Sequence, residues 1–211
     1  MCLKPTGARA ALLSRALRFL RPILHPLICQ QEFAFCRDVL SGVTDGKLSL
    51  HLNEDTLPLM LADRSPVIYL PSGPDGLKLT SSAKDELRAF ARAEALPDEL
   101  REKLITACWE GVTNAVKYGF GGSLRICASA TRIQVWITDR GPGISLSQIP
   151  SATLRDGYST GGTAGLGYTL MINSAHHLDL MTSPRGTTVV LTWPRESAED
   201  PRITQMMERY S

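Results

Sequence analysis

Apolar residues between about Pro66 and Pro194 follow two spacings, one typical of strands and one typical of helices. The strand-like runs lie at 67–70, 124–129, 132–138, 178–181 and 187–193. The helical spacings cover about 79–94, 98–118 and 165–175. The second and third strands are close enough in the chain to form a hairpin. This order predicts one α/β (α+β) two-layer sandwich, in which antiparallel-compatible strands and helices form separate layers.

A shorter segment, residues 32–65, precedes this unit and carries apolar residues of its own. Within it, Lys47-Leu-Ser-Leu-His-Leu52 alternates between apolar and polar residues as a strand does. The segment is too short to bury a separate core, so we expect it to pack on the larger unit. Its role is not indicated by the sequence. The polar residues 195–211 are expected to form a frayed tail or a weak helix.

Residues 1–31 form a basic leader, with Lys and Arg side chains but no acidic residue before Glu32. Apolar residues recur in it at the spacing of an amphipathic helix until Pro22 and Pro26 interrupt the pattern. No apolar run approaches the roughly 18–20 residues that span a bilayer, and no secretory cleavage pattern follows. Two interpretations stay open: a loosely ordered leader or overlong start, which is favoured, and a helix that binds a membrane surface or a partner.

Composition places the chain among soluble globular proteins, with 43% hydrophobic and 21% charged residues. A formal net charge of +2 gives no general case for nucleic-acid binding. The five cysteines include no C-x-x-C pair, and their spacing indicates neither a zinc site nor a disulfide framework. Cys108 and Cys127 lie in apolar runs and are predicted to be buried thiols. A reducing, cytoplasmic compartment is therefore expected.

The first candidate cluster lies on the helix predicted over 98–118. Glu110 and Asn114 are four residues apart, so they share one face of that helix. An amide oxygen suits Mg²⁺, which prefers oxygen ligands and keeps several waters and substrate phosphates around it. A carboxylate one turn away can accept a proton from an attacking hydroxyl or water. On their own, the two residues also fit solvent-facing helix positions.

The second cluster, Asp139-Arg-Gly141-Pro-Gly143-Ile144, directly follows the strand predicted over 132–138. A carboxylate at a strand end can accept a hydrogen bond from an exocyclic amine such as that of adenine. The adjacent glycines let a flat base lie against the backbone. The same letters also form an ordinary β-turn without a ligand.

The third cluster is a glycine-rich stretch that opens the last predicted helix: Gly161, Gly162, Thr163, Ala164, Gly165, Leu166 and Gly167. The free N–H groups and the dipole of a helix start favour phosphate, although a flexible linker would have the same composition. It is neither a Walker loop nor a Rossmann fingerprint. The irregular stretch before it, Ser145 to Thr163, has the length of a functional loop and is interpreted as a lid. Thr187, after Gly186, could support the base site through its hydroxyl.

In this order, the clusters resemble the Bergerat ATP-binding fold of the GHKL superfamily, named for gyrase, the heat-shock chaperone, histidine kinases and MutL. Glu110 and Asn114 match its N box, and Asp139-x-Gly141-x-Gly143 matches its G1 box. Gly165-Leu-Gly167 matches its G2 box, and Gly186-Thr187 matches the pair near its last strand. The resemblance covers about Pro66 to Pro194, which would be the ATP-binding kinase domain (66–194).

Within this superfamily the chain is most similar to anti-sigma-factor serine/threonine kinases and their switch-kinase relatives. Glu110-Gly-Val-Thr-Asn114-Ala-Val is similar to their E-A-x-T-N-A-x motif, and Pro184-Arg-Gly-Thr-Thr-Val-Val is similar to their C-terminal strand. Tyr118 and Phe120 stand where these kinases have His and an aromatic residue. The lid sequence is closer to the switch-kinase type, which weakens the case for direct sigma-factor binding.

The resemblance implies a mixed, mostly antiparallel sheet with helices on one face. It implies that Glu110 is the catalytic base, that Asn114 binds Mg²⁺, and that Asp139 and Thr187 recognise the adenine of ATP. The glycine-rich stretch would enclose the phosphates. The partner would be a small anti-anti-sigma-type (STAS-like) protein or a sigma factor, and such kinases often form homodimers.

Two alternative functions remain at this point. A nucleotide-gated binding module could sequester a sigma factor or another regulator with little turnover, but it would not need a base at Glu110. The catalytic half of a histidine kinase is disfavoured, because His25 and His51 lie outside any helical pair that could carry a phosphoacceptor.

Overall fold

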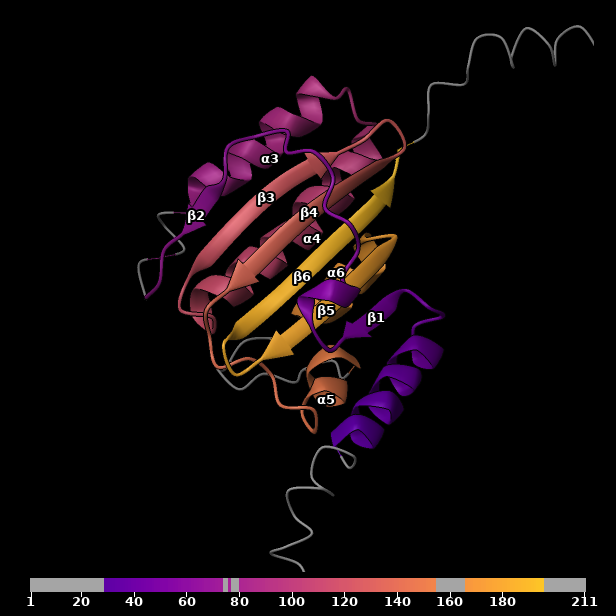
Figure 1. The fold of residues 1–211 in the computed structure, drawn as a ribbon. Helices are drawn as coiled ribbons and strands as arrows, with labels where there is room; N and C mark the ends of the chain where they lie inside the picture. The colour runs from indigo at the N-terminus through magenta and orange to yellow at the C-terminus, as the bar shows by residue number, and fades with distance from the viewer. Residues whose placement is uncertain (1–28, 74–75, 77–79, 155–165, 196–211) are drawn as a thin grey trace, which may run out of the picture.

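A six-stranded sheet organises the part of the chain that this computed structural model describes, residues 29–73, 76, 80–154 and 166–195 (Figure 1). Its strands are β1 (Leu48–His51), β2 (Ile68–Leu70), β3 (Gly122–Ala128), β4 (Arg132–Asp139), β5 (His177–Ser183) and β6 (Gly186–Pro194). They lie in the order β1-β5-β6-β4-β3-β2. β1 runs parallel to β5, and the other neighbouring strands pair antiparallel. The predicted mixed, mostly antiparallel sheet is confirmed.

Helices cover one face of this sheet. They are α3 (Ser81–Ala93), α4 (Asp98–Lys117) and α6 (Gly167–Ser174), and Figure 1 shows them together behind the strands. The short helices α5 (Ile149–Leu154) and η1 (Glu54–Thr56) lie elsewhere, and a further helix occupies residues 29–43 beside β1. The predicted arrangement of strands and helices in separate layers is therefore confirmed.

The main core lies between the sheet and these helices, on the face to which every second residue of a strand points. In β4, Ile133, Val135 and Ile137 are buried in that core. Full burial of such a side chain contributes about 1.5–3 kcal/mol. Gly111 brings α4 close, since a Cβ there would lie 2.5 Å from Ile137 Cδ1 and 3.5 Å from Met171 Sδ. The absence of a side chain at Gly111 therefore lets α4 pack closely on β4 and α6.

The opposite face of the sheet is covered by the chain itself, through residues 52–66, which we call the strap. The strap crosses in front of the strands between β1 and β2 (Figure 1). Its Leu57 and Leu61 pack against a second cluster of buried residues, Cys127, Trp136 and Val190. Residues 32–65 thus lie against the larger unit, with β1 in its sheet and the strap on its outer face.

Hydrogen bonds fasten the strap to β3 and β4. The Gln134 side-chain oxygen accepts from the Leu61 N–H at 3.1 Å and from the Trp136 indole N–H at 3.2 Å. Asp63 forms an ion pair with Arg125 at 3.1 Å and accepts from the Cys127 thiol at 3.3 Å. Cys108 and Cys127 are fully buried, as predicted, and burial raises the pKa of the Cys127 thiol to about 12.

A buried ionic cluster joins β1 to β5 on the strap side of the sheet. Asp179 Oδ1 lies 2.7 Å from His51 Nε2 and 3.4 Å from His177 Nε2. Burial alone would raise the pKa of Asp179, but the hydrogen bonds and charges of the two histidines outweigh it and hold that pKa below its usual value. The hydrogen bond to Asp179 raises the pKa of His177, against the opposing effect of burial.

This cluster is expected to stabilise the fold most at mildly acidic pH. The Asp179 contribution is present above the ordinary carboxyl pKa of 3.8 and is lost as pH falls through its lower folded-state pKa. The His177 contribution is complete below the ordinary pKa of 6.5 and is lost as pH rises through its higher folded-state pKa. Urea unfolding should therefore show His177→Gln less stable than wild type by about 1 kcal/mol between these values, and by less in alkali. The exposed neighbour His176→Gln is the control, because it makes the same substitution outside the contacts of Asp179.

Two elements differ from expectation. The stretch predicted to be irregular, Ser145 to Thr163, contains α5, in which Ile149 is fully buried and Thr153 Oγ1 donates to the Ile149 carbonyl at 2.8 Å. The segment before β1 contains the helix over 29–43, which buries Cys36 and Leu40.

The amphipathic pattern of the leader and the tail from residue 196 lie outside the described residues. Within the described ranges, no helix combines the length and apolarity needed to cross a membrane.

Candidate functional site

Three strands carry a polar residue at the same end of the sheet, on the side that faces the helices. In β5 the buried Leu178 and Leu180 are followed, two residues on, by Thr182. Thr182 is the cross-strand partner of Thr187 in β6. On β4, Thr138 pairs with Thr188 of β6. The next residue of β4, Asp139, therefore lies opposite Thr187. The row Thr182–Thr187–Asp139 therefore places one carboxylate and two hydroxyls side by side at one end of the sheet.

Asp139 is partly buried and accepts several hydrogen bonds. Its Oδ1 accepts from the Gly141 N–H at 2.9 Å and from the Thr187 N–H at 3.0 Å. Burial raises the pKa of Asp139, while these N–H groups and the Thr187 hydroxyl act in the opposite direction. The interactions leave the carboxylate an acceptor with spare lone pairs, which suits an amine donor on a ligand.

The glycine turn after Asp139 is held against the end of β5. Gly143 has φ 69°, and a Cβ there would lie 2.8 Å from Thr182 Oγ1, so glycine is required at this position. The next residue, Ile144, donates its N–H to Thr182 Oγ1 at 2.8 Å. The turn therefore has a fixed place beside Asp139.

Glu110 and Asn114 both lie against the first residue of α6. A Cβ at Gly167 would be 3.2 Å from Glu110 Oε2 and 3.4 Å from Asn114 Nδ2. Both side chains are half-buried, on the face of α4 that packs on α6. A carboxylate and an amide thus lie together at a helix start, where unpaired N–H groups favour phosphate.

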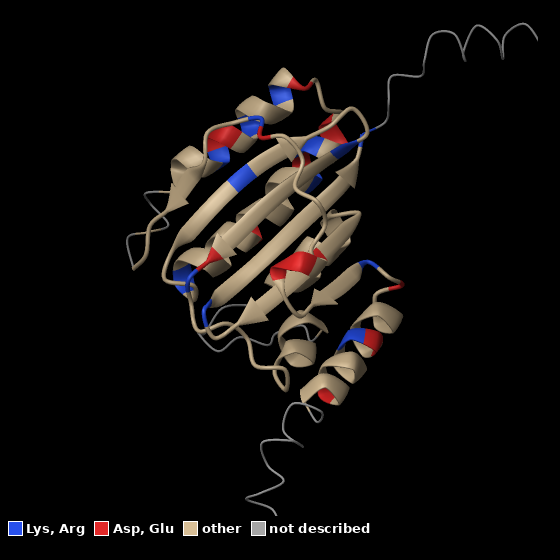
Figure 2. Ribbon diagram, in the orientation of Figure 1, with Lys and Arg blue, Asp and Glu red and all other residues tan. Residues whose placement is uncertain are grey.

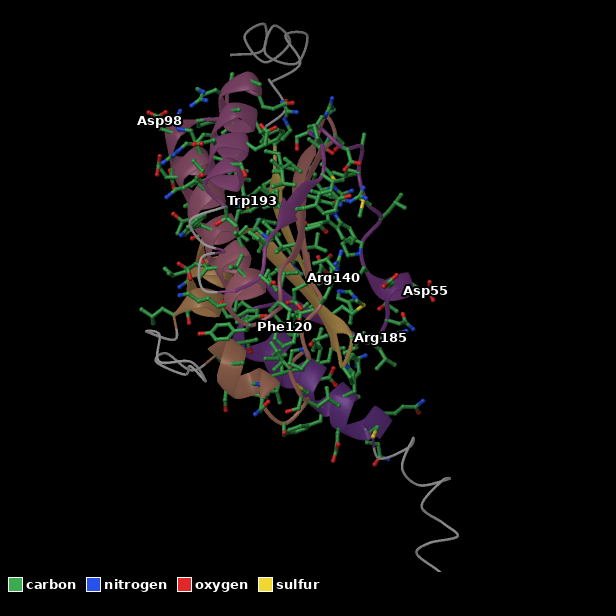
Figure 3. The ribbon with its side chains drawn as sticks, turned by 90° about the vertical axis from the view of Figure 1, so that its left-hand side faces the viewer. Asp55, Asp98, Phe120, Arg140, Arg185 and Trp193 are labelled. Atoms are coloured by element: carbon green, nitrogen blue, oxygen red, sulfur yellow. The ribbon has the colours of Figure 1, made fainter. Side chains whose placement is uncertain are left out.

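Basic side chains surround this end of the sheet. Lys117 is the last residue of α4, Arg140 follows Asp139, and Arg185 lies in the turn between β5 and β6; all three are exposed. Figure 2 shows basic segments at the end of the sheet where β4 and β5 finish. In Figure 3, Arg140 and Arg185 lie toward the same end as Phe120, with Trp193 and Asp98 toward the other. Positive charge here favours an anionic ligand.

The structure brings together most of the residues singled out from the sequence. Asp139, Gly141, Gly143, Ile144 and Thr187 lie around the end of β4, and Glu110, Asn114 and Gly167 meet where α4 packs on α6. Leu166 is the N-cap of α6 and is partly exposed. Gly161, Gly162, Thr163, Ala164 and Gly165 lie outside the described residues. Thr182 was not predicted to belong to the site. The signal that could have found it is a polar residue that follows Leu178 and Leu180 on the same face of β5.

Comparison with known families gives a match to the model of the histidine kinase-like ATPase domain over residues 73–193. The chain belongs to this family. The matched range contains α3, α4, β3, β4, α6, β5 and β6, together with the described candidate site residues. As a histidine kinase-like ATPase domain within the GHKL superfamily, it has an ATP-binding fold. Helix 29–43, β1 and the strap precede the matched range.

Solved structures with a related fold include the RsbU and RsbW domains of a protein from Mycobacterium tuberculosis. The likeness has a TM-score of 0.44 at 16% identity, and it covers 63% of this chain and 34% of that one. Another is the mycobacterial sensor histidine kinase MprB, with a TM-score of 0.40, 17% identity, and coverage of 61% of this chain and 97% of that one. The chain thus spans about a third of the first of these. A comparison with curated proteins finds none that matches.

Proposed function

We propose that this protein is an ATP-dependent protein serine/threonine kinase that phosphorylates a small regulatory protein of the anti-anti-sigma (STAS-like) type. The observation that supports the proposal best is the placement of Glu110 and Asn114 against Gly167 at the start of α6. ATP bound with its base at Asp139 and its phosphates at α6 would present its terminal phosphate to this pair. A domain that only binds nucleotide has no need of a carboxylate there.

Residues of this chain would orient the nucleotide before any transfer occurs. Asp139 would accept from the adenine amine, because its Oδ1 is already held by two backbone N–H groups. The N–H groups at the start of α6 would donate to phosphate oxygens. Lys117, Arg140 and Arg185 would attract the anionic nucleotide over longer distances. Such positioning supplies much of the catalysis of phosphoryl transfer.

The side-chain oxygens that α4 presents beside the start of α6 fit Mg²⁺ as ligands. Asn114 offers an amide oxygen beside the Glu110 carboxylate. Within the described ranges, no three His, Cys, Asp or Glu side chains gather as a metal-binding group. Mg²⁺ suits a site with few protein ligands, since it keeps several waters and binds phosphate oxygens. When bound, it would neutralise charge on the phosphates, and Asn114 is the residue that would hold it.

Glu110 would act on the incoming hydroxyl of the protein substrate. The hydroxyl oxygen would form a bond to the γ-phosphorus as the bond from phosphorus to the bridging oxygen of ADP breaks. The hydroxyl proton would pass to the Glu110 carboxylate, and ADP would leave. The STAS-like partner rests on the similarity of Glu110-Gly-Val-Thr-Asn114-Ala-Val and Pro184-Arg-Gly-Thr-Thr-Val-Val to the anti-sigma kinases.

The direct test is transfer of labelled phosphate from [γ-³²P]ATP to purified STAS-domain proteins from the same source organism. We expect Mg²⁺-dependent labelling of a Ser or Thr in one of them. Stable binding of a partner in ATP without labelling of any of them would favour the alternative, a nucleotide-gated module that sequesters a regulator. Absence of ATP binding by calorimetry would contradict both functions.

Replacing Asn114 by Ala should remove the Mg²⁺ dependence of nucleotide binding. Because Asn114 is assigned to Mg²⁺, the variant should bind ATP in Mg²⁺ about as weakly as wild type binds it in EDTA, and it should transfer no phosphate. Calorimetry with and without EDTA on both proteins measures this. A variant that still binds ATP more tightly in Mg²⁺ than in EDTA would show that the ion is held elsewhere.

A further inference from the structure

Thr182 lies at the centre of the hydrogen bonds that join the glycine turn to the proposed base site. Its Oγ1 accepts from the Ile144 N–H at 2.8 Å and lies 3.2 Å from Thr187 Oγ1. The three groups come from different segments: the turn after β4, the end of β5 and the start of β6. The hydroxyl therefore links both sides of the site.

The direction of these hydrogen bonds follows from the number of protons. The Thr187 hydroxyl has one proton, and its hydrogen bond with the Asp139 carboxylate acts to lower the pKa of that carboxyl against the effect of burial. Either oxygen of the Thr182–Thr187 pair could be the donor, and we assign Thr182 as the donor because the Thr187 proton is then left for the carboxylate. In this assignment the donors run in one direction, from the Ile144 N–H through Thr182 and Thr187 to Asp139.

We propose that Thr182 is a positioning residue for nucleotide recognition: its hydroxyl orients Thr187 toward Asp139 and holds the glycine turn beside the base. The assignment rests on the proposed binding of ATP at Asp139. Thr182 would not touch the nucleotide's reacting atoms; it would act through Thr187 and Ile144. Because a donor directed at a carboxylate favours its ionised form, Thr182 would also help keep Asp139 an acceptor.

Other groups around Asp139 do not duplicate this role. Tyr168 lies on α6, and burial together with the charge of Asp139 raises the pKa of that phenol. Gly119 approaches Asp139 from the connection between α4 and β3, and Gly186 approaches it from the start of β6. The N–H groups of Gly141 and Thr187 complete its surroundings. Thr182 controls the orientation of the hydroxyl donor in this set.

The matched variants are Thr182→Val, which removes the hydroxyl and keeps the shape, and Thr182→Ser, which keeps the hydroxyl. Thr188→Val is the control, since Thr188 forms an equivalent 3.2 Å hydroxyl pair with Thr138 in the neighbouring cross-strand row. The Thr138 and Thr188 side chains lie on the strap side of the sheet, the face opposite to the Asp139 side chain. Circular dichroism establishes that each variant is folded.

The first measurement needs no nucleotide: titration of the Asp139 side-chain carbon by ¹³C NMR. We expect Thr182→Val to increase the pKa of Asp139 by about half to one pH unit, the equivalent of losing one hydrogen bond. Thr182→Ser should restore the wild-type titration, and Thr188→Val should not change it. An unchanged titration in Thr182→Val, or a failure of Ser to restore it, would overturn the role of Thr182.

The second measurement is calorimetry with Mg·ATP and Mg·GTP over a range of pH. We expect Thr182→Val to bind ATP about threefold to tenfold more weakly, with a smaller preference for ATP over GTP. The loss of binding in acid should also begin at higher pH than in wild type. Wild-type affinity and selectivity in Thr182→Val would refute the proposal. Wild type that binds neither nucleotide would instead refute the proposed function, and the NMR titration would still decide the link to Asp139.

Discussion

Glu110→Gln is expected to lower the rate of phosphate transfer by a factor on the order of 10² or more, the usual contribution of a general base. The amide keeps the size of the side chain against Gly167 but cannot accept the hydroxyl proton. Nucleotide affinity should stay within several-fold of wild type, because Glu110 is assigned to the protein substrate and not to ATP. Single-turnover transfer from labelled ATP, paired with calorimetry, separates the two effects.

Asn114→Ala provides the comparison for this experiment, since it should lose Mg²⁺-dependent binding and transfer together. A Glu110→Gln protein that phosphorylates its partner at the full rate would exclude the assigned base. If Glu110→Gln is slow in transfer but regulates its partner normally, sequestration would be the main activity.

Asp139→Asn is expected to weaken ATP binding by about 10² or more, with little change in the fold. The amide oxygen can replace Oδ1 as acceptor for the Gly141 and Thr187 N–H groups. Its NH₂ group would then face the adenine amine, so that two donors meet and neither is paired. The same NH₂ suits the carbonyl of hypoxanthine, so the preference for ATP over ITP should fall. Competition calorimetry with ATP and ITP measures this ratio.

Asp179→Asn is a matched control for that substitution. It removes the charge of another buried aspartate of the sheet, on the strap side and away from the nucleotide. It should lower the free energy of unfolding and leave the ATP to ITP ratio unchanged. An Asp139→Asn protein with normal ATP affinity would mean that the base is read by other residues.

The central part of the fold could be predicted because its pattern is local. The apolar, β-branched runs of β4 and β6 and the helical spacing of α4 are visible in a single sequence. α5 was not predicted, since six residues with Pro, Ser and Thr carry less than two turns of periodicity. The position of the strap depends on Leu57 and Leu61 packing against the cluster of Cys127, Trp136 and Val190, a contact between distant segments that local spacing does not encode.

The candidate site was predictable to the extent that each cluster had its own local signal. Glu110 and Asn114 are one helical turn apart, and Asp139 is followed by glycines. Thr182 had only a weak signal, because its role depends on the register that pairs it with Thr187. Register arises from the pairing of whole strands, so the residues that orient a site are harder to find than those that carry its chemistry.

The strap has a practical consequence for work on the ATPase domain alone. A shortened protein that begins at Pro66 would keep the whole family match but would uncover Trp136, Val190 and the Cys127 thiol. It would also leave β5 as an open sheet edge, with unpaired backbone groups along the strand. Such a protein is expected to self-associate and to oxidise at Cys127, which size-exclusion chromatography and thiol titration would detect. We therefore expect the independently folding unit to be larger than the range matched by the family and to include residues 29–65.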